Sequence, residues 1–255
     1  MKKTSEEKNI GIEKINVRGI FFDNVNMEEA VEKCRELFVS GGKPKIIHTP
    51  NAEVVQLCVE QPDYYSLING ADLIIPDGAG VILASKILKT PLKKGRVPGV
   101  ELGDRLAETA AESGWKLFLY GGQPGVAELA AEKLTEKYPR LNICGICHGY
   151  VKEYGEVIEK INASGAELLF ICTGAPRQEK WMRENIDKLN VKLMAGLGGS
   201  IDIYSGNVKR APLIFRKLNL EWLHRLIGDP KRIRRMMKLP KFIIGTVFYS
   251  IKNKN

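Results

Sequence analysis

The sequence lacks the apolar segments that mark exported or membrane-spanning proteins. Its N-terminus, MKKTSEEKNIG, carries charges but no apolar stretch of the kind that a secretory signal peptide contains. No run reaches the roughly 18 apolar residues that a transmembrane helix requires, and the longest run near the end, residues 242–251, is only about half that length. We therefore expect a cytoplasmic protein that does not cross a membrane.

Patterns for metals and cofactors are also scarce. The histidines (His48, His148 and His224) lie far apart, and no Asp-x-Asp string occurs. Cys144 and Cys147, followed by His148, match the attachment string of c-type haem, but haem attachment needs export and zinc needs a second pair of ligands. We interpret this segment as a strand end running into a turn, with reduced thiols, and we expect neither a metal nor a cofactor.

Three catalytic or nucleotide-binding fingerprints are absent as well. The chain has no GxGxxG string, no Walker A string and no nucleophile elbow. The first absence disfavours a dinucleotide-dependent oxidoreductase, which is one alternative function for a chain with glycine-rich turns.

What the sequence does contain is a regular alternation of short apolar runs and amphipathic stretches, which is typical of βα units. Strands are expected at residues 45–49, 73–75, 116–120, 142–144, 167–172 and 192–196, and helices most clearly at 27–40, 100–113, 124–138, 153–163 and 176–189. The predicted fold class is α/β, a Rossmann-like, largely parallel sheet flanked by helices. It has a small N-terminal β-hairpin at residues 15–25 and a C-terminal basic helical appendage.

The net charge of the chain is confined to its C-terminal end. Residues 213–255 contain 11 lysines and arginines against two acids, which equals the +9 of the whole chain. Apolar residues lie among these cations, as in helices at a membrane interface. We therefore divide the chain into an α/β core, residues 1–212, and a basic membrane-targeting appendage, residues 213–255, broken at residues 228–230 and at Pro240. A solvated helix or a packed C-terminal segment is the alternative.

Polar or glycine-rich turns follow five of the expected strands. Ligands of parallel α/β sheets bind at the carboxyl ends of the strands, so these turns are the first candidates for a site. Gly121, Gly122 and Gly125 would let backbone N–H groups approach a phosphate, as would the turn with Gly199 and Ser200. An ordinary strand-to-helix turn explains the glycines at 121–125 equally well.

Most of the polar candidates have both a structural and a chemical interpretation. Asp77, in an apolar and glycine-rich setting, is a helix N-cap or a general base. Thr49 and Asn51 are helix caps or substrate ligands. Arg177 and Gln178 offer a cation and an amide at a helix start, beside the favourable end of the helix dipole. Arg96 meets an anion or is a solvated loop charge.

Several strings taken together resemble one family, in the right order from about residue 15 to residue 238. They are HTPNAE at 48–53, IPDGAG at 75–80, GRVPGVEL at 95–102, LYGG at 119–122, GAPRQEKW at 174–181, GLGGS at 196–200, RAP at 210–212 and LEWL at 220–223. This set resembles the WecG/TagA/CpsF glycosyltransferases, glycosyltransferase family 26.

The resemblance implies an inverting transfer from a UDP-sugar to undecaprenyl-diphosphate-linked GlcNAc. The donor is UDP-N-acetylmannosamine in the branch that makes the wall teichoic acid linkage unit, and the corresponding uronic acid in another branch. It implies that Asp77 is the base, that Thr49, Asn51 and Gln178 belong to the site, and that arginines of the appendage complete it at the inner face of the cell membrane. These arginines are Arg225, Arg232 and Arg235.

Two questions stay open at this level. A non-catalytic membrane- or nucleic-acid-binding module would also carry a basic tail, but this tail lacks the interleaved aromatic residues of a stacking platform, so we expect no nucleic acid. The donor sugar is not determined, because the two candidate sugars differ by one carboxylate. Apolar surface on the core is also compatible with an oligomer that exchanges with the monomer.

Overall fold

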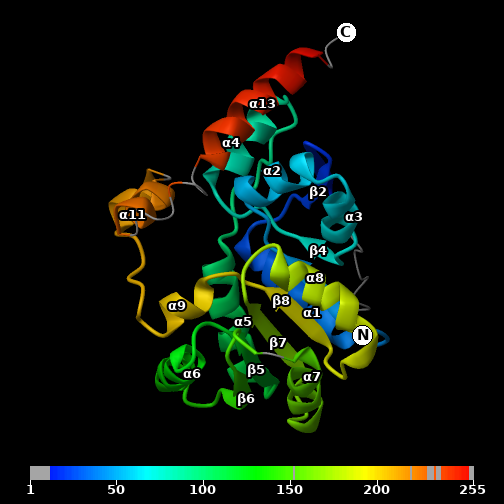
Figure 1. Ribbon diagram of the computed structural model, residues 1–255, viewed down its shortest axis with the longest axis vertical. Helices are drawn as coiled ribbons and strands as arrows, with labels where there is room; N and C mark the ends of the chain where they lie inside the picture. The colour runs from blue at the N-terminus through cyan, green and yellow to red at the C-terminus, as the bar shows by residue number, and fades with distance from the viewer. Residues whose placement is uncertain (1–11, 152, 219, 229–232, 234–236, 253–255) are drawn as a thin grey trace, which may run out of the picture.

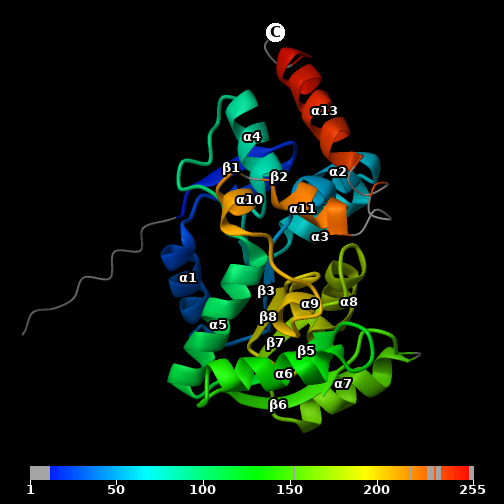
Figure 2. The same ribbon diagram turned by 90° about the vertical axis from the view of Figure 1, so that its left-hand side faces the viewer.

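The structure is a computed structural model that describes residues 12–151, 153–218, 220–228, 233 and 237–252. For residues 217, 225 and 228 it describes the backbone alone. Figures 1 and 2 show a central sheet between layers of helices, with the last helix projecting from one end.

The central sheet has six strands, all parallel, in the order β4-β3-β8-β7-β5-β6. This confirms the predicted fold class. The strands are β3 (Lys45–His48), β4 (Leu73–Ile74), β5 (Lys116–Gly121), β6 (Asn142–Cys147), β7 (Leu168–Cys172) and β8 (Leu193–Gly196). The expectation that the strand ends near Cys144 is wrong, because β6 continues to Cys147, with a register shift opposite Leu117 and Phe118.

Helices cover both faces of this sheet (Figure 2). One face packs against α1 (Met27–Val39), α5 (Gly99–Ser113) and α6 (Val126–Lys137), and the other against α7 (Tyr154–Ala163) and α8 (Arg177–Asn185), which a short 3-10 turn η1 (Ile186–Lys188) follows. Alternate residues of β7 show the division, because Phe170 packs with the first group while Leu169 and Ile171 pack with the second. All five strand residues are buried, as expected for a parallel sheet covered on both sides.

A second apolar cluster lies beside the β4 edge of the sheet. It joins the predicted hairpin, β1 (Lys14–Val17) and β2 (Ile20–Asp23), to α2 (Ala52–Glu60), α3 (Asp63–Asn69) and α4 (Ala79–Ile87). None of these three helices was among those that the apolar spacing most clearly predicted. Phe22, Tyr64, Ile68 and Val81 are buried at its centre.

The C-terminal segment contains α9 (Ser200–Tyr204), α10 (Leu213–Lys217), α11 (Glu221–Gly228) and α13 (Lys238–Lys252). The predicted break at Pro240 is wrong, because Pro240 lies in the first turn of α13, where proline is tolerated. The expected break at residues 228–230 falls partly outside the described residues.

The helix α13 packs on α2 and α4, buries Phe242 in the second cluster and also buries Thr246. Gly80 of α4 makes this approach close, since a Cβ there would lie 2.7 Å from Leu239 Cδ1. Part of the appendage is therefore packed, as the alternative interpretation expected. Among the described helices, none combines the length and the hydrophobicity that a membrane crossing needs.

Candidate functional site

A cleft with a volume of about 1040 Å³ lies at the carboxyl edge of the sheet. The segments that follow all six strands contribute residues to it, so segments that are distant in the sequence meet in one place. Nine of the eleven core residues predicted for the site line this cleft. They are Thr49, Asn51, Asp77, Arg96, Gly122, Arg177, Gln178, Gly199 and Ser200.

Asn51 and Thr49 also serve the backbone around the cleft. Asn51 is the N-cap of α2, and its Oδ1 accepts hydrogen bonds from the N–H groups of Glu53 (2.9 Å) and Val54 (3.1 Å). The cap interpretation is therefore correct for Asn51. For Thr49 it is wrong, because the Thr49 hydroxyl donates to the carbonyl of Gly196 at 2.9 Å and joins the ends of β3 and β8.

Asp77 stands on the cleft wall between β4 and α4. The interpretation of Asp77 as the N-cap is wrong, because the N-cap residue of α4 is Gly78, at φ 91°. The backbone N–H of Asp77 donates to the Pro50 carbonyl at 3.4 Å, which joins the backbone of Asp77 to the turn that carries Asn51. Asp77 lines the cleft, and its role as general base stays a prediction.

The glycines of the turn after β5 have different positions. Gly122 lines the cleft, whereas Gly121 and Gly125 do not. Gly121 has φ 143°, and a Cβ there would lie 2.5 Å from the carbonyl carbon of Cys172, so its role is to let β5 and β7 approach. Gly125 is the N-cap of α6 at φ 84°. The structural interpretation is therefore correct for Gly121 and Gly125, whereas phosphate binding at Gly122 stays a prediction.

Gln178 and Arg177 begin α8 at the end of a turn beside the cleft. The Gln178 side chain is buried, its Oε1 accepts from the N–H of Gly198 at 2.9 Å, and its Nε2 donates to Glu179 at 2.8 Å. Arg177 donates to the Thr173 carbonyl at 2.9 Å, and its guanidinium carbon lies 5.7 Å from the ring centre of Tyr150. Gln178 therefore holds the wall of the cleft, while Arg177 places a cation on it.

Arg96 joins the core to the appendage at the mouth of the cleft. Its Nη1 lies 3.1 Å from Glu221 Oε2, and its Nη2 donates to the Arg216 carbonyl at 3.1 Å. The anion that Arg96 meets is thus an acid of α11, while Arg210 pairs with Glu101 nearby. The appendage arginines predicted for the site are not described in full. Arg232 and Arg235 lie outside the described residues, as does the side chain of Arg225.

Some cleft residues were missed by sequence reasoning. Tyr150 is 55% exposed and lines the cleft from the turn after β6, and Asp202, Glu221 and Trp222 also line it. The sequence patterns did not indicate Tyr150, because the strand was expected to end near residue 144. The turn at 148–151 was therefore not expected to follow a strand directly. A strand predicted to extend to Cys147 would have placed Tyr150 in the turn that follows it.

Buried ionisable groups lie behind the cleft. Burial lowers the pKa of His48 to about 4, so this histidine is neutral at physiological pH. Burial also raises the pKa of Glu179, although hydrogen bonds from Tyr64 and Gln178 oppose that rise. Within the described part of the chain, no three His, Cys, Asp or Glu side chains gather in a way that suits a metal ion.

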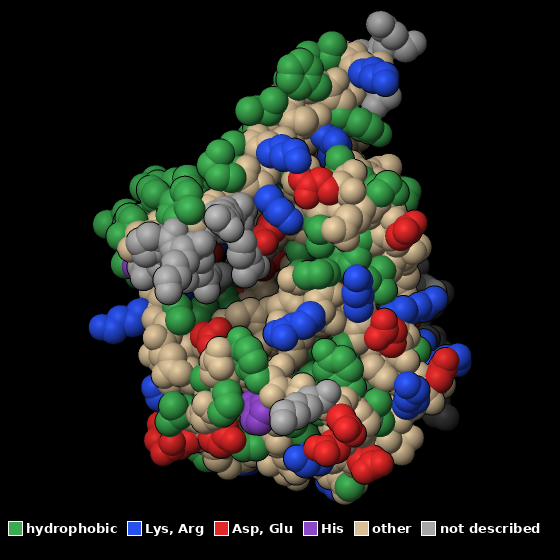
Figure 3. All heavy atoms as spheres, in the orientation of Figure 1, with side chains coloured by type: hydrophobic (Ala, Val, Ile, Leu, Met, Phe, Trp, Pro, Cys, Tyr) green, Lys and Arg blue, Asp and Glu red, His purple; other side chains and the backbone are tan. Residues whose placement is uncertain are grey.

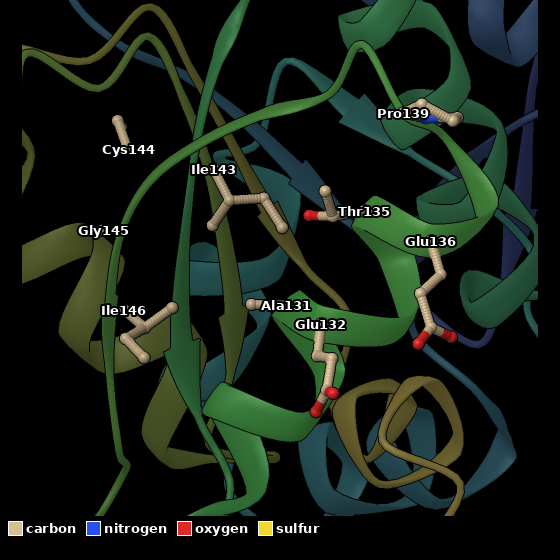
Figure 4. A pocket seen from close by; sticks show the side chains of 9 residues that line it. All are labelled: Ala131, Glu132, Thr135, Glu136, Pro139, Ile143, Cys144, Gly145 and Ile146. Carbon is tan, nitrogen blue, oxygen red and sulfur yellow. The ribbon is translucent and has the colours of Figure 1, made fainter.

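A second hollow, of about 770 Å³, lies between α6 and β6 (Figure 4). In Figure 4, Ala131 and Thr135 of α6 face Ile143 of β6, whereas Glu132 and Glu136 point away from the strand. None of the predicted site residues lines this hollow. We therefore place the candidate site in the cleft at the strand ends.

The fold and the cleft define an α/β protein with a candidate ligand site at the carboxyl edge of a parallel sheet. The sequence matches the "Glycosyl transferase WecG/TagA/CpsF family" over residues 15–255. It is 37% identical over 232 residues to an "N-acetylglucosaminyldiphosphoundecaprenol N-acetyl-beta-D-mannosaminyltransferase" of Staphylococcus aureus strain MRSA252, which covers 90% of this chain and 91% of that protein. Proteins with the same name in strains MW2 and NCTC 8325 / PS 47 show the same identity and coverage. The chain belongs to this glycosyltransferase family, as the sequence motifs predicted.

Proposed function

We propose that this protein transfers N-acetylmannosamine from UDP-N-acetylmannosamine to undecaprenyl-diphosphate-linked GlcNAc, with inversion at the sugar carbon and with Asp77 as the general base. The observation that carries the proposal is the position of Asp77 in a cleft that the turns with Gly122 and Gly198 also line. The name of the relatives that are 37% identical supports this donor sugar and this acceptor.

In this reaction the acceptor hydroxyl of GlcNAc attacks C1 of the donor sugar. A new C1–O bond forms while the bond between C1 and the diphosphate breaks, the hydroxyl proton passes to the Asp77 carboxylate, and the electron pair leaves with UDP. A positioned base contributes roughly 10²- to 10⁴-fold to the rate. Negative charge grows on the departing diphosphate, so the site also needs positive potential at that end.

The donor half of the cleft offers groups that suit a nucleoside diphosphate. Gly122, Gly198 and Gly199 bring backbone close to the cleft surface, and Arg177 adds a cation. Tyr150, exposed beside Arg177, offers an aromatic ring on which the uracil ring of UDP would stack. We propose that these groups, together with appendage arginines, stabilise UDP without a divalent metal.

The acceptor is a lipid, so the cleft has to reach a bilayer. The exposed face of α13 carries apolar side chains, which include Ile244 (57% exposed), Phe248 (68%) and Ile251 (60%), and α10 and α11 expose others. Figure 3 shows green hydrophobic side chains along the projecting end of the molecule and at the left, where Figure 1 places α11, with blue lysine or arginine side chains near the tip and below. Together with the cationic composition of residues 213–255, this surface supports a peripheral position on the inner face of the cell membrane.

Product analysis tests the proposed function. The protein is incubated with a water-soluble GlcNAc-diphosphate-lipid analogue and, in turn, with UDP-N-acetylmannosamine, its uronic acid and UDP-GlcNAc, each with and without EDTA. We expect a disaccharide from the first donor, with inverted configuration and an undiminished rate in EDTA. Product from the uronic acid alone would reassign the donor. A loss in EDTA that Mg²⁺ or Mn²⁺ restores would contradict the metal-free stabilisation of UDP.

A further inference from the structure

A buried carboxylate stands directly behind the cleft wall. Glu179, in the first turn of α8, is 3% exposed, and each of its carboxylate oxygens has a hydrogen-bond donor. Tyr64 of α3 donates to Oε2 at 2.6 Å, and Gln178 donates to Oε1 through Nε2 at 2.8 Å. A chain of buried bonds therefore runs from α3 through α8 to the cleft, because Gln178 in turn accepts from Gly198 at 2.9 Å.

The chemistry of the amide makes this chain directional. A glutamine side chain has one oxygen that accepts hydrogen bonds and one NH₂ group that donates them. The Glu179 carboxylate offers an acceptor and attracts the NH₂ group, so the oxygen of Gln178 faces the Gly198 N–H. In the flipped orientation, carbonyl would face carboxylate and NH₂ would face N–H. The acceptor on Glu179 thus selects the orientation that holds Gly198.

The space around the amide is also restricted. A Cβ at Gly196 would lie 3.1 Å from Gln178 Nε2, so the strand end and the amide are in close contact. Thr49 holds the Gly196 carbonyl from the other side. Thr49 and Gln178 thus each hold one residue of the turn from Gly196 to Ser200, and of these two contacts only the one to the Gly198 N–H depends on how a side-chain amide is turned.

We propose that Glu179 is a positioning residue, whose carboxylate sets the orientation of the Gln178 amide and thereby holds the Gly198–Ser200 wall of the cleft in the geometry that donor binding and transfer require. This inference rests on the proposed function and deepens it. Glu179 touches no reacting atom in this account and acts through Gln178 alone. A misplacement of about 1 Å at such a wall can cost on the order of 10²-fold in rate.

The test compares Glu179→Met with Glu179→Gln. Methionine keeps the volume but removes the acceptor, so we expect kcat/KM to fall by about tenfold to a hundredfold. In Glu179→Gln the new amide oxygen faces Gln178 and its NH₂ group donates to the Tyr64 hydroxyl, so activity should stay within about threefold of the wild type. Equal losses in the two variants, or no loss in either, would overturn the proposal.

A double-mutant cycle separates positioning from general loss of structure. If Glu179 acts through Gln178, the variant with both Gln178→Met and Glu179→Met should be no less active than Gln178→Met alone. Losses that multiply would show that Glu179 acts by another route. The melting temperature and the Kd for UDP are measured for every variant.

If Glu179→Met fails to fold, gentler substitutions test the same link. Tyr64→Phe and Glu179→Gln should each keep most of the activity, whereas the double variant leaves the new amide without the hydroxyl that orients it and should lose more than the product of the two. A loss of activity in the double variant that equals the product of the two single losses would contradict the proposal. If the wild type binds UDP but transfers none of the sugars tested, the proposed function fails while UDP affinity still tests the Glu179 link. A wild type that neither binds nor transfers would overturn both.

Discussion

Polar side chains at the strand ends of this protein hold the backbone and face the cleft at once. Asn51 caps α2, Thr49 binds the Gly196 carbonyl and Gln178 binds the Gly198 N–H, yet all three line the cleft. The turns of the site are thereby held by residues adjacent to where the substrate would lie. Such preorganisation is what a transfer reaction needs, since groups that are already in place cost nothing to align during the reaction.

The sharpest prediction for a single residue concerns Asp77. Asp77→Asn keeps the shape but removes the base, so we expect kcat to fall by about 10²- to 10⁴-fold while the Kd for UDP and the melting temperature change little. Steady-state kinetics and calorimetry measure the two effects. The matched control is Asp187→Asn, whose carboxylate pairs with Lys43 on the surface and should leave both quantities unchanged. Normal turnover in Asp77→Asn would remove Asp77 from the role of base.

Sequence patterns predicted which residues line the cleft, but they did not predict the contacts that these residues make. Nine predicted residues line the cleft because parallel strands bring their carboxyl ends to one edge, which the order of strands and turns already implies. The partner of Thr49 lies 147 residues away, and that of Arg96 lies 125 residues away, so no local pattern indicates them. The caps were ambiguous for a related reason, because capping and ligand binding use the same residue types at helix starts.

At the scale of elements, the appendage divides into faces with different tasks. One face of α13 packs Phe242 against α2 and α4, which carry Asn51 and follow Asp77, while the other face exposes Phe248. Lys241 adds a pair with Glu60 of α2 at 2.6 Å. Deletion of the whole appendage would therefore disturb the core as well as any membrane contact.

Two substitutions in α13 test this division. Phe242→Ala removes a buried ring and should lower the free energy of unfolding by about 3–5 kcal/mol. Phe248→Ala removes an exposed ring and should change the free energy of unfolding by no more than about 0.5 kcal/mol. Urea unfolding of the two variants measures the difference. Similar values for both would mean that α13 does not pack on the core in solution.

The elements that sequence patterns missed share a physical cause. The helices α2, α3 and α4 have 9, 7 and 9 residues, too short for a clear helical period, and tertiary packing around Phe22 and Tyr64 stabilises them. Pro240 was expected to break a helix, but only a proline beyond the first turn removes an intrahelical hydrogen bond. The longer helices and the six strands were predictable because their apolar spacing is clear.

At the level of the whole molecule, the net charge lies in a different part of the chain from most of the residues that line the cleft. The first 212 residues are electrically balanced and form the sheet with its cleft, while the last 43 residues carry the net charge of +9. The two parts meet where Arg96 binds Glu221 and the carbonyl of Arg216. We propose that the core performs the transfer and that the appendage brings the cleft to the lipid. The predicted exchange between monomer and oligomer stays a prediction.

One measurement separates these two tasks. The rate of transfer is compared for the wild type and the Ile244→Ser/Phe248→Ser variant, on acceptor embedded in anionic vesicles and on a short-chain acceptor free in water. Loss of two interfacial apolar side chains should lower the vesicle rate by about tenfold or more and leave the rate in water unchanged. The control is Leu129→Ser, which changes an exposed leucine of α6, at the end of the molecule opposite α13, and should change neither rate. Equal rates for the variant and the wild type on vesicles, or an equal loss on both acceptors, would contradict the account.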